Sequence, residues 1–203
     1  MKTKVLGLIA VCTIVAASFG APMTSEAATL IYDATLSGAA EVPANASTGT
    51  GAAIITIDDV ASTMSVVMTF NGLSAAVSAS LIHCCAPVGI NTIVATSLPG
   101  FPATTAGTYF NTLDMTSLAN YTAGFLTANG GTAASAFTAL LTGLAADDAY
   151  INIHDSVFPG GEIRGQLVPA STPLPAALPL FATGLGALGL LGWRRKRKAA
   201  AAA

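Results

Sequence analysis

The chain contains only two histidines, His83 and His154, and each follows an isoleucine near the end of a segment that alternates as a β-strand. Alternation directs neighbouring side chains to opposite faces, so each imidazole is expected to point away from the core. With Asp155 or Glu162, the two imidazoles would provide donors that hold a divalent metal ion. The alternative is structural, with each ring N–H bonded to a loop carbonyl. The sequence alone leaves both open.

Two cysteines, Cys84 and Cys85, are adjacent in the sequence and directly follow His83. Adjacent cysteines cannot link distant segments, so they form a vicinal disulfide, pair with another chain, or stay reduced. The targeting segments described below predict an oxidising compartment, and for this reason we favour the vicinal disulfide.

Glu162 and Arg164 lie two positions apart in a segment that is expected to be a strand, so they should share one face. We therefore expect Arg164 to pair with Glu162 or with a loop carboxylate. Gly160 and Gly161 precede them and are expected to supply backbone angles that other residues avoid. No nucleophile–base pair and no phosphate-binding loop can be placed, so no catalytic residue is assigned.

These residues must be positioned by a mainly β domain. Alternating or β-branched runs predict strands at 29–36, 52–58, 63–70, 77–83, 108–113, 149–154 and 162–168. Apolar residues three and four positions apart predict a helix at 132–145, and 87–107 is expected to be loop. We expect a single β-sandwich-like domain with one helical insertion.

The charge of this domain excludes some partners. Residues 28–172 contain nine acidic residues and one basic residue, Arg164, so their formal charge is −8, although the whole chain has −2. Nucleic-acid binding depends on Lys and Arg, so we exclude it. An anionic polysaccharide is likewise disfavoured as an electrostatic partner, whereas cations are compatible with this charge.

The first 27 residues are typical of a secretory signal peptide. Lys2 and Lys4 precede an uncharged apolar run, and small residues then lead to a cleavage site after Ala27. This assignment predicts the Sec translocon and a signal peptidase as partners. A retained anchor is the alternative, but the run is short for a membrane-spanning helix.

The other end is predicted to cross a membrane. Residues 169–173 form a linker, and 174–193 are twenty residues without a charge, ending at Trp193. A basic tail, 194–203, follows and should stay on the cytoplasmic side. Its basic cluster consists of Arg194, Arg195, Lys196, Arg197 and Lys198.

The order of these C-terminal features resembles the PEP-CTERM sorting signal. Thr172, Pro173, Leu174 and Pro175 stand where that signal usually has Val-Pro-Glu-Pro, and the apolar segment and basic cluster follow. The resemblance implies a Gram-negative bacterium, transient anchoring in the inner membrane, cleavage by an exosortase-type protease, and release to the cell surface or extracellular matrix. The alternative is a permanent single-pass anchor.

Three motifs in the domain, spanning 28–168, resemble those of the CHRD family. The first is LSGAAEVP at 36–43, and the second is LIHCCAP at 81–87, where Leu81 replaces the first histidine of the His-x-His that many members carry. The third and most specific comprises Asn152, His154, Phe158, Pro159, Gly160, Gly161, Glu162 and Arg164. The family has no established enzymatic activity that the resemblance could imply.

We therefore expect an exported, non-catalytic surface or matrix protein without a cofactor, which meets an exopolysaccharide or another matrix component. The alternative is a secreted metal-binding domain, with a divalent ion held by His83 and His154 and a metal-dependent redox activity.

Overall fold

The computed structural model describes residues 29–170. The expected signal peptide with its cleavage site at Ala27, the sorting motif, the apolar segment 174–193 and the basic tail all lie outside the described residues. No helix within 29–170 has the length and apolar character needed to cross a membrane.

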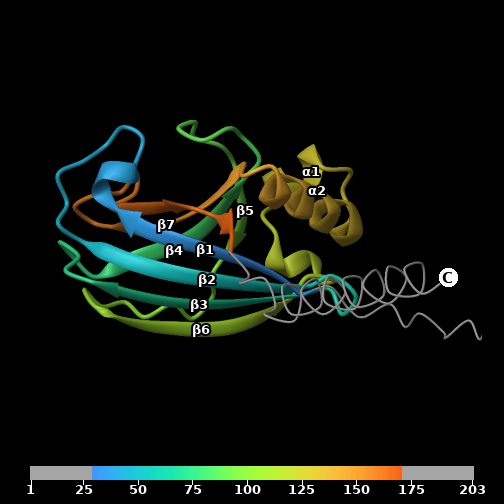
Figure 1. Ribbon diagram of the computed structural model, residues 1–203, viewed down its shortest axis with the longest axis horizontal. Coiled ribbons are helices and arrows are strands. Elements are labelled where there is room, and N and C mark those ends of the chain that lie inside the picture. Colours follow the sequence, from blue (N-terminus) through green and yellow to red (C-terminus); the bar gives the residue numbers. More distant parts are fainter. Residues whose placement is uncertain (1–28, 171–203) are drawn as a thin grey trace, which may run out of the picture.

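The described part is mainly β, as expected, and forms one antiparallel sheet in the order β5-β4-β7-β8-β1-β2-β3-β6, with β9 also paired to β1 (Figure 1). The strands are β1 (Thr29–Ser37), β2 (Thr50–Asp58), β3 (Thr63–Asn71), β4 (Val77–Cys84), β5 (Val94–Ser97), β6 (Gly107–Asp114), β7 (Ala149–Asp155), β8 (Ile163–Gln166) and β9 (Val168–Pro169).

The expected sandwich takes the form of this single sheet curled over itself, so that β4 and β7 lie above β2, β3 and β6 (Figure 1). Alternate residues of each strand point into the space enclosed by the curl. Ile55, Met64, Ile82 and Ile151, from four different strands, are all completely buried there. Removing side chains of this size from water stabilises the fold by about 1.5–3 kcal/mol each.

Two helices close one end of the curl. The expected helix is confirmed as α2 (Ala133–Ala145), and its Thr132 and Ser135 form a reciprocal capping box. The short α1 (Ala123–Ala128) precedes it and begins at Thr122, whose hydroxyl accepts a hydrogen bond from the Phe125 N–H. Neither α1 nor β5 was predicted.

Candidate functional site

The outer face of β4, β7 and β8 carries four polar residues that the sequence singled out, together with Tyr150, which it did not. Tyr150, Asn152 and His154 alternate along β7, so all three point away from the curled core. The strand register places His83 of β4 opposite Tyr150 and Arg164 of β8 opposite Asn152. Cross-strand partners share a face, so five side chains meet on one side of the sheet. We call this set the outer polar cluster.

Loops cover most of the cluster and remove it from water, although His154 remains partly exposed. Arg164 and Asn152 are each only 2 % exposed, and His83 is 8 % exposed. The loops that follow β1 and β4 both lie over this side of the sheet (Figure 1). The cluster is therefore a second, polar interior rather than an open surface.

Among residues 29–170, Arg164 has no carboxylate partner. Its Nη1 donates to Oδ1 of Asn91 at 2.9 Å, and its Nη2 donates to the carbonyl of Ile90 at 3.2 Å. Its guanidinium carbon lies 3.3 Å from the centre of the Tyr150 ring. The expected pairing with Glu162 is wrong, because β8 begins only at Ile163 and the preceding carboxylate turns towards other loops.

That carboxylate ties two loops to the start of β8. Oε1 of Glu162 accepts hydrogen bonds from the Ser47 hydroxyl at 2.7 Å and from both the backbone N–H and the hydroxyl of Ser74 at 2.8 Å. Its Oε2 is buried without a hydrogen-bond partner.

Asp155 organises the turn that follows β7. It accepts hydrogen bonds from the backbone N–H groups of Ala75, Val157 and Phe158 at 2.6–2.9 Å. Burial raises its pKa, but these backbone N–H donors favour the charged form and outweigh burial, so the pKa lies below its ordinary value. The carboxylate is thus held charged and engaged.

Both histidines use one ring nitrogen in the same way. Nδ1 of His83 lies 2.8 Å from the carbonyl oxygen of Thr92, and Nδ1 of His154 lies 3.0 Å from that of Pro159. Within the described part of the chain, Nε2 of each ring is buried without a hydrogen-bond partner. Burial lowers the pKa of His83 below its ordinary value, so this ring is neutral near pH 7.

The expected three-ligand metal site with Asp155 or Glu162 is wrong. Within residues 29–170, no group of three His, Cys, Asp or Glu side chains is arranged to hold a metal ion. Both carboxylates instead serve the loop contacts described above. The two histidines remain close, with ring centres 6.5 Å apart.

Glu41 joins the cluster from the loop after β1 and was not singled out from the sequence. It is 6 % exposed, and its Oε1 is buried without a partner. Burial raises its pKa to about 7, although the nearby Arg164 and Asn152 side chains act in the opposite direction. Its carboxylate lies against Gly161, leaving no room there for a Cβ atom. Gly161 also has a φ of +125°, whereas Gly160 has no positive φ, so the expected backbone role is confirmed for Gly161 alone.

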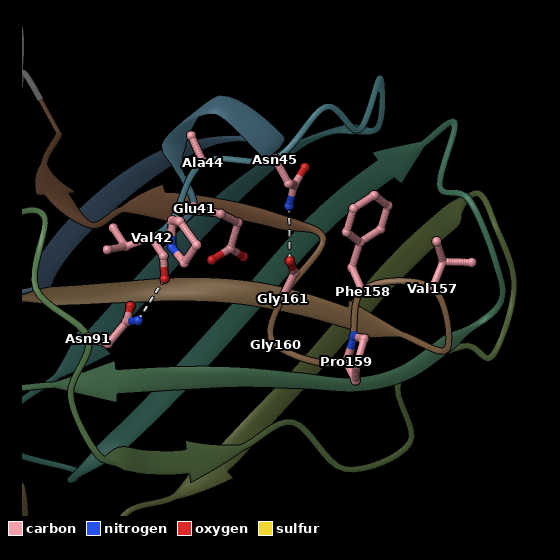
Figure 2. A pocket seen from close by; sticks show the side chains of 11 residues that line it. Glu41, Val42, Ala44, Asn45, Asn91, Val157, Phe158, Pro159, Gly160 and Gly161 are labelled. Carbon is pink, nitrogen blue, oxygen red and sulfur yellow. Dashed lines mark hydrogen bonds between the residues drawn. The ribbon is translucent and has the colours of Figure 1, made fainter.

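A pocket of about 440 Å³ opens between the first and third motifs. Figure 2 shows Glu41 between the loop at Val42 and the turn at Gly161. The two asparagines at its rim are already engaged: Asn45 donates to the carbonyl of Gly161 at 3.1 Å, and Asn91 donates to that of Val42 at 2.7 Å. Glu41 therefore supplies the acid group of this pocket.

The vicinal disulfide between Cys84 and Cys85 is confirmed. Cys84 ends β4 and is completely buried. Gly143 of α2 packs directly against both sulfur atoms. The disulfide is therefore a packing contact between the helical layer and the sheet, beside the outer polar cluster.

The sequence analysis did not identify several residues of the site, mainly because they contact residues far away along the chain. Glu41 belongs to the first motif, but its contact with Gly161 joins loops that are far apart along the chain. Tyr150 could have been found, since it shares the alternation of Asn152 and His154. Asn91, in an exposed loop, gives no comparable signal.

Comparison with known proteins gives one match. No curated protein and no solved structure matches the chain. The CHRD domain family matches residues 32–167, which is more than half of the sequence. The match includes all three motifs. These motifs contain His83, Asn152, His154 and Arg164 of the outer polar cluster, as well as Glu41 and the disulfide. The chain belongs to the CHRD domain family.

Proposed function

We propose that this CHRD protein is an exported, non-catalytic module of a Gram-negative cell surface or extracellular matrix. Residues 1–27 direct it through the Sec translocon to signal peptidase, and an exosortase-type protease processes the segment that begins near Pro173. The inner-membrane anchor at 174–193 is transient, and the released domain meets an exopolysaccharide or another matrix component.

The proposal of a non-catalytic role rests on what the polar side chains of the motifs contact. Arg164, Asp155 and Glu162 all form hydrogen bonds with backbone or side-chain groups of loop residues. Such contacts fix the shape of loops on a rigid sheet, as in modules whose loops bind a partner. The pocket at Glu41 lies between two of these ordered loops and is where we place that partner.

The charge of the domain limits the partner. Residues 28–172 have a formal charge of −8, so close approach of an anionic polymer would be opposed at low salt. We therefore propose a neutral or cationic matrix polymer. The export proposal rests on the order of the terminal segments and is independent of this choice.

A doubly tagged full-length protein tests export and processing. One epitope is placed in the exposed turn at Asp59, and a second follows Lys198. In the native bacterium, the surface-exposed protein should keep the internal epitope and lack the terminal one. A surface protein that carries both epitopes would refute processing and favour a permanent anchor.

A matched pair of deletions tests what the sorting segment does. Deletion of 173–198 should abolish surface display and matrix attachment, whereas deletion of 199–203 should leave both unchanged. If both deletions leave display and matrix retention at the level of the intact protein, the proposed route is wrong.

A second candidate function, the metal-binding domain, is favoured by the unpaired Nε2 atoms of His83 and His154.

A further inference from the structure

We propose that Nε2 of His83, Nε2 of His154 and the side-chain oxygen of Asn152 form a binding site for one first-row transition-metal ion that prefers imidazole ligands. Copper(II) is expected to bind more tightly than zinc. This inference goes beyond the proposed surface role and does not depend on it.

The hydrogen bonds of the two rings determine which nitrogens are free. A neutral imidazole carries one N–H, and each Nδ1 lies beside a backbone carbonyl, which can only accept. In the neutral form of each ring, Nδ1 therefore carries the proton and Nε2 presents a lone pair. Metal-binding histidines are typically fixed in this way, with the second ring nitrogen donating to a carbonyl.

Three buried acceptor atoms lie in this cluster. Among residues 29–170, Nε2 of His83, Nε2 of His154 and Oδ1 of Asn152 have no hydrogen-bond partner, although the Asn152 side chain lies close enough to His83 to affect the pKa of that ring. A buried acceptor without a partner costs about 1–3 kcal/mol, so leaving three of them together is unfavourable. One cation that binds all three would remove these costs at once.

The spacing of the rings suits one shared ion. Metal–nitrogen bonds of about 2.0–2.1 Å place the centres of two imidazoles on one ion roughly 5–6.5 Å apart, depending on the bond angle. The centres of His83 and His154 are 6.5 Å apart, which corresponds to a nearly linear arrangement of the two nitrogens about the ion, as for opposite ligands of a square-planar copper(II) ion. A tetrahedral ion such as zinc would require the two rings to move closer together. Asn152 lies on the same strand face as His154, two positions before it.

The donor set indicates the class of metal. The two cysteines of the domain are joined in a disulfide, so they offer no thiolate to a soft ion. Two imidazoles and one amide oxygen suit copper(II) or zinc and leave room for solvent in the first coordination sphere. The site needs no third His, Cys, Asp or Glu, consistent with the absence of such a group from residues 29–170.

Two charges next to the site act in opposite directions. Arg164 influences His83 electrostatically and opposes a cation there. The carboxyl group of Glu41 lies on the same side of the sheet and favours a cation when it is ionised. The guanidinium is already bound to Asn91, Ile90 and Tyr150, so no rearrangement of Arg164 is required.

Metal titration of the purified full-length protein tests the site. After removal of metal, we expect one equivalent of Cu²⁺ to bind in competition with a chelator, and Zn²⁺ to bind the same site more weakly. Electron paramagnetic resonance of the copper form should show coupling to two imidazole nitrogens. This readout uses the unaltered protein and needs no variant to fold.

Variants separate the site from adventitious binding to the acidic surface. Loss of either imidazole, by His83→Gln or His154→Gln, should weaken copper binding by more than the roughly 10–100-fold cost of losing a residue that only orients a ligand. The control Asp58→Asn/Asp59→Asn removes two carboxylates at the end of β2 and in the turn after it, keeps an oxygen that can accept the turn's hydrogen bonds at position 58, and should leave the affinity unchanged.

Two results would overturn the inference. One is a copper spectrum with only oxygen ligands, or with no more than one imidazole nitrogen. The other is retention of the tight equivalent in a folded His83→Gln/His154→Gln protein. Binding lost in the Asp58→Asn/Asp59→Asn control would likewise assign the metal to the surface.

Discussion

The guanidinium of Arg164 lies 3.3 Å from the centre of the Tyr150 ring, and the same ring stacks on His83 with its centre 4.5 Å away. The three planar groups form one buried contact across β8, β7 and β4. A cation–π contact thus takes the place of the ion pair expected for the only basic residue of the domain. The contacts of Arg164 depend on more than its charge. The planar guanidinium stacks on the Tyr150 ring, and its N–H groups donate to Asn91 and Ile90.

Arg164→Lys should therefore be strongly destabilising, although the charge is kept. An ammonium group cannot both stack on Tyr150 and donate in the same geometry to Asn91 and Ile90. We expect the free energy of unfolding to fall by about 2–4 kcal/mol, because a buried charge loses hydrogen bonds. Urea unfolding at pH 7 measures it.

Tyr150→Phe is the matched control for that variant. It keeps the ring beneath the guanidinium and removes only a hydroxyl, which accepts a long 3.4 Å hydrogen bond from the Thr92 N–H. A loss of less than about 1 kcal/mol is expected. Equal stability of Arg164→Lys and wild type would show that stacking and the donor fork contribute little.

Gly161→Ala should be destabilising, whereas Gly160→Ala should be nearly neutral. Gly161 has a φ of +125°, and a Cβ there would overlap the Glu41 carboxylate, whereas nothing lies within 4 Å of a Cβ at Gly160. Backbone strain and overpacking together should lower the free energy of unfolding by about 2–4 kcal/mol. Thermal unfolding of both variants tests the contrast, and similar midpoints would contradict it.

Much of the sheet could be predicted because one side of each strand is buried. Alternation located β7, with Ile151 and Ile153 inside and His154 on the opposite face. β5 was missed because Val94–Ser97 is only four residues long and lies in a stretch rich in turn residues. α1 was missed for a similar reason, since six residues are too few to show a helical period.

The site was less predictable, since its contacts depend on loops. The outward direction of His83 and His154 followed from alternation and agrees with the strand register and with the contact of each ring with a loop carbonyl. The expected Arg164–Glu162 pair failed because sharing a face also requires both residues to belong to the strand, and Glu162 precedes it. Glu41 reaches the cluster through the loop after β1, and the length of that loop carries no information on where its carboxylate lies.

The titration of Glu41 should make stability depend on pH. Burial raises its pKa from 4.5 to about 7, so between these values the folded protein holds a proton that the unfolded chain has released. The stabilisation from the protonated acid is complete below pH 4.5 and is lost as the pH rises to about 7. Glu41→Gln cannot titrate and should show a flatter profile over this range.

Urea unfolding of the wild type and of Glu41→Gln at several pH values between 4.5 and 8 measures this difference. As the pH rises, the free energy of unfolding should fall more in the wild type than in the glutamine variant, because the buried carboxylate becomes charged only in the wild type. Asp59→Asn, a change in an exposed turn, is the control and should leave the wild-type profile unaltered. A constant difference between the two proteins across the range would mean that Glu41 titrates normally in the folded protein.

Two glycine-to-alanine changes in the helices should have opposite signs. Alanine favours a helix interior over glycine by up to about 1 kcal/mol, so Gly124→Ala in α1, where nothing lies within 4 Å of the new Cβ, should be neutral or stabilising. At Gly143 in α2 the new Cβ would overlap the sulfur atoms of Cys84 and Cys85. Overpacking there should outweigh the helix preference and destabilise by about 1–2 kcal/mol. Thermal unfolding decides the matter: if Gly143→Ala is as stable as Gly124→Ala, then α2 does not rest against the disulfide and the helical layer is attached to the sheet by other contacts.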